Sequence, residues 1–122
     1  MKKSLRPYFP HDANARFNRK IMALRAEYGN EGYAWFFMLL EMMRGEPERR
    51  LSLKPTELMR ITKELDMTLP KQASDFIDYC VELKLLTKQG EDYVYSEGLD
   101  RRMIPVDSRI KQSRTAAKKR WK

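Results

Sequence analysis

Residues 70–95 decide the fold and read PKQASDFIDYCVELKLLTKQGEDYVY. Apolar residues in the first half recur at helical spacing, which predicts a helix from Pro70 to about Lys84. Its buried stripe consists of Phe76, Ile77, Cys80, Val81 and Leu83. Two short apolar runs then flank a polar turn at residues 88–91, which is typical of a β-hairpin. A helix that leads directly into a hairpin is the closing part of a winged helix.

A short strand and another helix are predicted immediately upstream. Residues 51–53 alternate as a strand, and Pro55 suits the first turn of a helix. The inward face of that helix consists of Leu58, Ile61, Thr62 and Leu65. The order strand, helix, helix, hairpin is that of a winged helix, with the helix at 70–84 in the recognition position and Gly90 near the wing tip.

Two further helices are predicted before this unit. The first is capped by Asp12 or Asn14 and stopped by Gly29, and its buried face consists of Phe17, Ile21, Leu24 and Tyr28. The second is capped by Asn30 and ends near Gly45. We therefore predict a mainly α fold with a small β-hairpin: a winged helix-turn-helix with an N-terminal helical extension and a basic C-terminal helical tail.

Length and composition favour one small domain. The 122 residues fit a winged-helix domain over residues 1–100 and a basic tail, or a linker to an absent C-terminal domain, over residues 101–122. Cys80 is the only cysteine, so an intrachain disulfide is excluded and a cytoplasmic location is expected. The longest apolar run, residues 33–40, is far shorter than the roughly 20 residues that span a bilayer, and no export signal is visible.

The positive charge is concentrated at the C-terminal end. Residues 1–100 hold 16 Lys or Arg and 16 Asp or Glu, whereas residues 101–122 hold nine Lys or Arg and a single acid, Asp107. So dense a run of cations favours a polyanionic partner, DNA before an anionic membrane, because the tail lacks a broad apolar face. A tail that only confers solubility is the alternative.

The tail is predicted to form a helix from Ser96 or Glu97 to about Ile104, a break at Pro105 and a second helix after it. Phosphate contact requires cations but no finer arrangement. The predicted DNA-binding residues are Arg101, Arg102, Arg109, Lys111, Arg114, Lys118, Lys119, Arg120, Trp121 and Lys122.

The helix at 70–84 is a weaker candidate for DNA recognition. Its polar residues and the wing offer four possible contacts, namely Lys71, Gln72, Ser74 and Lys88. Asp75, Asp78 and Glu82 follow on the same exposed side and would repel phosphate. A structural helix with a solvated acidic face is therefore the favoured interpretation.

The helix after Gly29 is apolar on all sides. Either the rest of this small domain or a second subunit must cover it. Residues for a possible oligomer interface are Trp35, Phe36, Leu39, Met42 and Met43.

The sequence gives no support to an enzyme. His11 is the only histidine, and it lacks the short ligand spacing of metal sites. Residues 29–32 lack the following Lys-Ser/Thr of a phosphate loop, and no serine lies in a nucleophile elbow. We expect no catalysis, no metal and no cofactor.

Three segments resemble a known family. They are Tyr8-Phe9-Pro10-His11-Asp12 with the following motifs at residues 20–33, then residues 79–86, and finally residues 114–121. Together they are similar to DnaD-like domains, and more narrowly to the N-terminal winged-helix domain of phage-type and mobile-element replication-initiation proteins. That domain is often described only as a domain of unknown function.

The resemblance implies a replisome-organising or primosomal accessory protein without catalytic activity. Such a protein works through DNA, self-association or a helicase-loading partner. Two hypotheses follow. The first is a DNA-binding domain that contacts DNA largely nonspecifically through its basic tail. The alternative is an oligomerisation and protein-interaction module of a primosome or replisome scaffold, with the tail as a linker.

Overall fold

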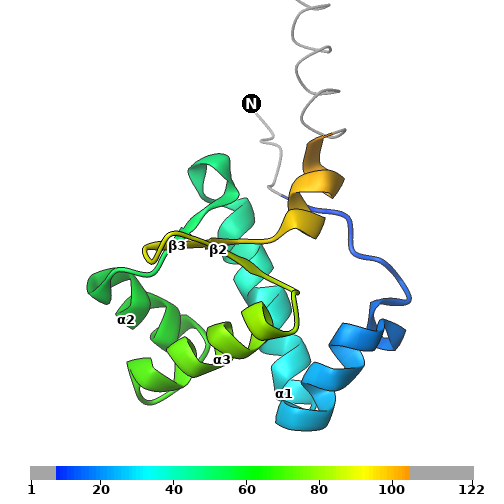
Figure 1. The fold of residues 1–122 in the computed structure, drawn as a ribbon, viewed down its shortest axis with the longest axis horizontal. Helices are drawn as coiled ribbons and strands as arrows, with labels where there is room; N and C mark the ends of the chain where they lie inside the picture. Colours follow the sequence, from blue (N-terminus) through cyan, green and yellow to red (C-terminus); the bar gives the residue numbers. More distant parts are fainter. Residues whose placement is uncertain (1–7, 105–122) are drawn as a thin grey trace, which may run out of the picture.

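The structure is a computed structural model and describes residues 8–104. Three main helices pack beside a small sheet: α1 (Arg19–Arg44), α2 (Pro55–Glu64) and α3 (Pro70–Glu82) (Figure 1). The strands are β1 (Leu51–Ser52), β2 (Thr87–Gln89) and β3 (Tyr93–Tyr95). Short 3-10 helices lie at Ala15–Phe17 and Pro47–Arg49, and residues 97–104 are helical. The predicted mainly helical fold with a small hairpin is confirmed.

The sheet is antiparallel, with strand order β1-β3-β2. Val94 in the central strand pairs with Leu51 on one side and Lys88 on the other. Leu51 and Val94 are fully buried, whereas Tyr93 is exposed on the opposite face. The predicted turn is displaced, because residues 88 and 89 belong to β2 and the reversal occurs at residues 90–92. Gly90 makes this possible, since it has a φ of 66°.

Gly29 divides α1 into two helical segments. It has φ 72° and ψ −165°, a backbone region that essentially only glycine occupies, so the predicted stop is confirmed. Asn30 does not cap the second segment. Its side-chain oxygen instead accepts hydrogen bonds from the Arg25 guanidinium at 3.0 and 3.1 Å.

The predicted start of the first helix was wrong. Asn18 is the N-cap, and its side-chain oxygen accepts from the backbone N–H groups of Lys20 at 2.9 Å and Ile21 at 3.4 Å. Asp12 accepts from the Asn14 backbone N–H at 2.9 Å and stabilises only the preceding turn. The extended Asn18 backbone breaks the helical register, so Phe17 lies 61% exposed and outside the inward stripe.

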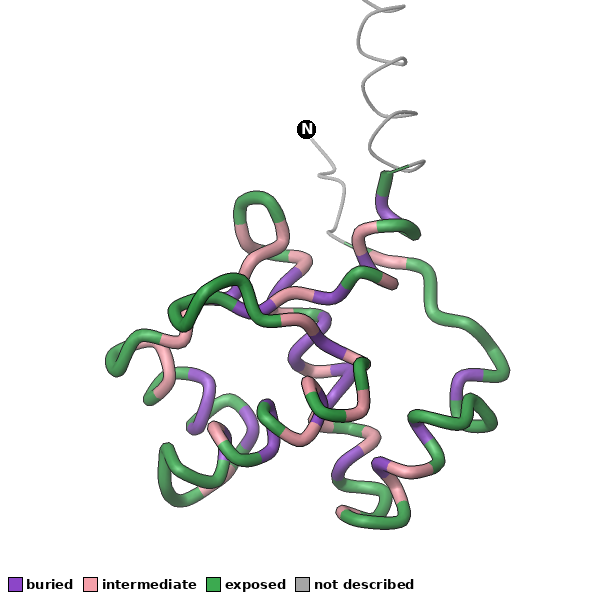
Figure 2. The backbone as a smooth tube through the Cα atoms, in the orientation of Figure 1, coloured by how far each residue is buried: buried purple, intermediate pink, exposed green. Residues whose placement is uncertain are grey.

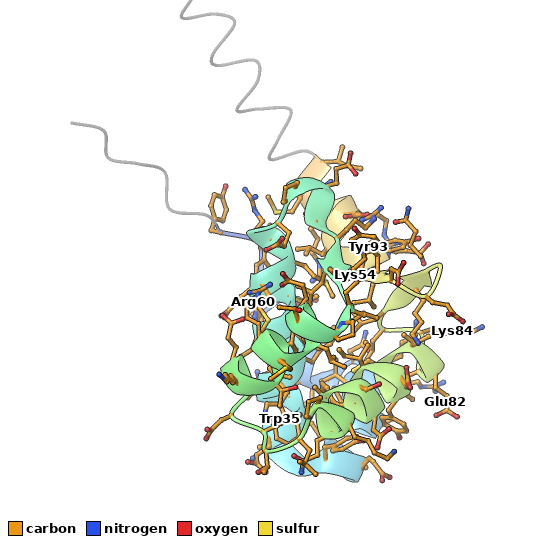
Figure 3. All side chains as sticks on the ribbon, turned by 90° about the vertical axis from the view of Figure 1, so that its left-hand side faces the viewer. Trp35, Lys54, Arg60, Glu82, Lys84 and Tyr93 are labelled. Carbon is orange, nitrogen blue, oxygen red and sulfur yellow. The ribbon has the colours of Figure 1, made fainter. Side chains whose placement is uncertain are left out.

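An aromatic cluster joins α1 to α3. The Tyr28 and Trp35 rings approach the buried Phe76 ring edge-on, with centroid distances of 5.1 and 5.3 Å. The Trp35 indole N–H donates to the Leu65 carbonyl at 3.0 Å, so its polar atom is satisfied (Figure 3). Buried positions lie along the inner sides of the helices in Figure 2. The largest fully buried side chains are Leu24, Leu39, Leu40, Met43, Leu51, Ile61, Leu65, Phe76, Ile77, Leu86, Leu99 and Met103.

The predicted oligomer interface needs correction. Phe36, Leu39 and Met43 are buried in the core of the single chain, with exposures of 5%, 0% and 0%. Trp35 and Met42 are half-buried against the same core. The domain itself therefore covers this helix, and these three residues offer no surface to a second subunit.

The helix at residues 97–104 is part of the folded body. The Ser96 hydroxyl accepts from the Leu99 backbone N–H at 3.0 Å, which confirms the predicted start. Leu99 and Met103 are buried to 1% and 0% exposure, so the boundary expected at residue 100 falls inside this helix. Within residues 8–104, none of the helices has the length and apolar character required to cross a bilayer.

We predict that alanine at either of two glycines of α1, Gly29 or Gly32, destabilises the domain. Gly29→Ala forces a side chain into a glycine-only conformation, and the new Cβ in Gly32→Ala would lie 2.7 Å from the Tyr28 Cβ. Each substitution should lower the free energy of unfolding by about 1–3 kcal/mol in urea titrations. Gly45→Ala is the matched control, because its nearest neighbour would lie at 3.6 Å. Equal stability of all three variants would contradict this account.

Candidate nucleic-acid interface

The lysines predicted for the recognition helix and wing are paired with carboxylates. The Lys71 ammonium lies 3.1 Å from an Asp75 oxygen, and the Lys88 ammonium lies 3.0 Å from an Asp78 oxygen. Such exposed pairs stabilise little, but they place a negative charge beside each lysine. Glu82 adds a further exposed carboxylate at the end of α3 (Figure 3). The outer side of α3 is therefore unfavourable for phosphate.

Gln72 caps the start of α3, and Ser74 lies half-buried beside α2 and the hairpin. The Gln72 side-chain oxygen accepts from the backbone N–H groups of Thr68 at 2.9 Å and Leu69 at 2.8 Å, so it caps the start of α3. Ser74 is half-buried and lines a cavity of about 120 Å³ between α2, α3 and the hairpin. Of the four predicted residues, Ser74 and Lys88 line this one hollow together with Asp78 and Glu91, whereas Lys71 and Gln72 are not among its lining residues.

Arg60 extends the same pattern to α2. Its guanidinium lies 3.0 Å from carboxylate oxygens of Glu57 and Glu64 and 3.8 Å from one of Glu46. The hydrogen bond to Glu57 raises the pKa of Arg60, with smaller contributions from the neighbouring charges. Arg60 (Figure 3) is therefore engaged within its own surface, as are Lys71 and Lys88. Among the exposed cations around α2 and α3 in residues 8–104, Lys54 and Lys63 have no carboxylate partner.

A hollow elsewhere on the folded domain is lined by more cationic than acidic residues. The first turn of α1, the end of α3, the start of β2 and the helix at 97–104 line a hollow of about 370 Å³. Its cationic residues are Lys20, Lys84, Arg101 and Arg102, and its acidic residues are Asp12 and Glu97. We call this hollow the basic groove. Its floor includes the apolar residues Ile21, Phe36, Phe37 and Leu40.

The end of α3 positions one side of the basic groove. Lys84 has a left-handed backbone with φ 64°, and the following N–H of Leu85 donates to the Cys80 carbonyl at 2.9 Å. This reversal directs the chain into β2. The Lys20 ammonium donates to the Lys84 carbonyl at 3.2 Å, which links the start of α1 to the end of α3. The Lys84 side chain extends away from the ribbon (Figure 3).

The helix at 97–104 positions the other side. Asp100 accepts from Arg49 at 2.9 Å and from Arg50 at 3.1 Å, and the Arg50 guanidinium lies 3.8 Å from the centroid of the Tyr95 ring. Together with the buried Leu99 and Met103, this contact fixes the rotation of the helix. Arg101 and Arg102 are exposed as a result, and no carboxylate within residues 8–104 pairs with either of them.

The sequence prediction of DNA-binding residues covers one part of this groove. Arg101 and Arg102 lie in it, whereas Arg109, Lys111, Arg114, Lys118, Lys119, Arg120, Trp121 and Lys122 lie outside the described residues. Sequence reasoning missed Lys20 and Lys84. Both lie in the segments at residues 20–33 and 79–86 that resemble DnaD-like domains, but these segments are far apart in the sequence and only the tertiary fold brings the two lysines together.

Cys80 and His11, the one cysteine and the one histidine of the sequence, are each packed against other residues of the fold. Burial raises the pKa of the Cys80 thiol to about 12, so it is protonated at neutral pH. The His11 ring stacks on Phe37 at 4.1 Å, and its Nε2 lies 3.2 Å from the Tyr33 hydroxyl. Within residues 8–104, no three His, Cys, Asp or Glu side chains are grouped as metal ligands.

We predict that Asp100 stabilises the basic groove. Asp100→Asn removes the charge that holds Arg49 and Arg50, and should lower the free energy of unfolding by about 1–2 kcal/mol. Amide hydrogen exchange in residues 97–104 should accelerate more than exchange in α2. Asp92→Asn, on the exposed hairpin turn, is the matched control and should change neither quantity. Identical behaviour of the two variants would exclude this role.

Comparison with known proteins gives one match. The family model described as Lin1244/Lin1753-like, N-terminal matches residues 8–99. No curated protein and no solved structure matches the chain. The matched range contains α1, α2, α3 and all three strands, and it ends before Arg101. The match therefore concerns the folded body and does not cover the predicted DNA-binding residues.

Proposed function

The chain belongs to the Lin1244/Lin1753-like, N-terminal family, and we propose that it is a non-enzymatic DNA-binding domain. Its contact surface is the basic groove together with the cationic residues that follow it. The observation that carries this proposal is the separation of charges. Lys84, Arg101 and Arg102 have no carboxylate partner within the described chain and line one hollow. On the α2–α3 side, Arg60, Lys71 and Lys88 have carboxylate partners, and only Lys54 and Lys63 lack one within residues 8–104.

The charge of the tail supports the same surface. Residues 101–122 hold nine Lys or Arg against one acid, and the first two of these cations lie in the basic groove. The cations after them continue directly from the fixed helix at 97–104. Phosphate contacts by these cations carry no sequence information, so the binding of duplex DNA is largely independent of sequence.

The topology supports a winged-helix assignment. The element order α1-β1-α2-α3-β2-β3 and the strand order β1-β3-β2 fit that architecture. In most winged helices, the position of α3 is the one that enters the major groove. Asp75, Asp78 and Glu82 on α3 argue against that approach here. We propose that DNA instead approaches from the side of the basic groove.

The proposed biological setting is cytoplasmic replication initiation of the phage type. This setting rests on the resemblance of residues 8–33 and 79–86 to DnaD-like domains. A homo-oligomer and a helicase-loading or primosomal partner belong to the same proposal. The alternative, a domain whose main task is self-association, loses its principal argument because Phe36, Leu39 and Met43 are buried in the chain's own core.

Fluorescence anisotropy with labelled duplex DNA tests the proposal. If about five cations engage phosphates, log affinity should fall with log salt at a slope of about −4 to −5. Substitution of Arg114, Lys118, Lys119 and Arg120 by Ala in the full chain should reduce the slope to about −1 and abolish binding at physiological salt.

The matched control removes four positive charges from other surfaces. Lys54, Lys63, Lys71 and Lys88 are exposed around α2, α3 and the hairpin. Their joint substitution by Ala should leave the affinity and the slope almost unchanged. Equal losses in the two variants would show that net charge alone drives binding, and absence of binding by the parent chain at low salt would refute the function.

A further inference from the structure

We infer that the basic groove receives an unpaired nucleotide segment, so that the domain prefers single-stranded to duplex DNA. The inference rests on the proposed function, because it assigns a strand type to the same surface. It starts from the size of the groove. At about 370 Å³, the hollow lies within the range of about 300–1,000 Å³ that is typical of small-ligand pockets. A single nucleotide can enter such a space, whereas a duplex would touch only its rim.

The polar groups of the groove match both parts of a nucleotide. Lys20, Lys84, Arg101 and Arg102 supply cations for phosphate oxygens. The lining residues also include Thr87, Asp12 and Glu97, and one Asp12 carboxylate oxygen already accepts from the Asn14 backbone N–H at 2.9 Å. A hydroxyl both donates and accepts hydrogen bonds, and a carboxylate accepts them from the exocyclic amine of cytosine.

The two carboxylates distinguish this occupant from others. A surface that only contacted the DNA backbone would be weakened by Asp12 and Glu97, because both repel phosphate. An acidic peptide would be repelled in the same way. An unpaired base turns the same carboxylates into useful acceptors, because its Watson–Crick edge is free of a partner strand. The mixed charge of the lining therefore favours an unpaired base with its phosphates.

The floor and the following sequence fit the same occupant. Ile21, Phe37 and Leu40 line the groove with exposures of 3%, 9% and 1%, so they close its floor, and an occupant is held mainly by the polar residues around it. Arg101 and Arg102 on the rim are followed by seven further cations up to residue 122.

The first experiment measures anisotropy of labelled oligo-dC, oligo-dT and a duplex of equal length with the full chain at fixed salt. The parent chain should bind oligo-dC at least about tenfold more tightly than the duplex. The double variant Lys20→Ala and Lys84→Ala should lose about tenfold on oligo-dC and less than about threefold on the duplex. Lys54→Ala with Lys63→Ala is the control of equal charge, and it should change neither affinity.

The second experiment tests whether removal of the Glu97 carboxylate raises or lowers the affinity for DNA. Glu97→Ala removes a negative charge, so pure electrostatics requires tighter binding to every DNA. A base contact requires the opposite for oligo-dC, with a loss of at least about fivefold and little change on oligo-dT. Glu91→Ala, on the exposed hairpin turn, is the matched control and should leave both affinities unchanged.

The outcomes separate this inference from the proposed function. Equal affinity for single strands and duplex, unaltered by the Lys20 and Lys84 substitutions, would overturn the groove assignment and leave DNA binding intact. Absence of binding to all three probes would overturn both. A labelled poly-glutamate peptide that binds the parent chain but not the Lys20/Lys84 variant, while DNA binding stays unchanged, would reassign the groove to an acidic peptide.

Discussion

The whole structure depends on covering the second segment of α1, whose buried side chains include Phe36, Phe37, Leu39, Leu40 and Met43. A domain this small cannot do so with one layer, so α2, α3, the sheet and the N-terminal segment each contribute to a single core. The helix at 97–104 completes the core through Leu99 and Met103, which are fully buried. The same helix carries Arg101 and Arg102. The position of the first cations of the tail is thus fixed by the hydrophobic core together with the contacts of Asp100 with Arg49 and Arg50.

The surface charges follow from this arrangement in two different ways. On α2 and α3, cations lie within one helical turn of carboxylates, as in the pairs Arg60–Glu64 and Lys71–Asp75. Around the basic groove, Lys20 and Lys84 come from segments that are remote in the sequence, and each lacks a local acidic neighbour at helical spacing. Short-range pairing therefore neutralises one side of the domain, and tertiary folding accumulates positive charge on another.

Much of the fold could be predicted because its signals are local. The stripe around Phe76, the stop at Gly29 and the turn at Gly90 depend on spacing and on glycine conformations. The start of the first helix could not be predicted, since Asp12, Asn14 and Asn18 are equivalent as caps in sequence and only the backbone decides among them. The basic groove was only half predicted. Arg101 belongs to a cationic run that is visible in the sequence. The contact between the Lys20 ammonium and the Lys84 carbonyl depends on the tertiary fold, so Lys20 could not be assigned to the groove from the sequence.

The interactions that hold α3 in place also restrict what it can recognise. Gln72 has a side chain suited to reading adenine, but its oxygen is already occupied by two backbone N–H groups. Lys88 is directed to Asp78, and so is unavailable to bridge from the wing to a phosphate. Because Gln72 caps α3 and Asp78 of α3 pairs with Lys88 of the hairpin, few polar side chains of this helix remain for contacts with bases. Under the proposed function, DNA binding therefore draws on phosphate contacts and on the groove lining, where Asp12 and Glu97 lie among the cations.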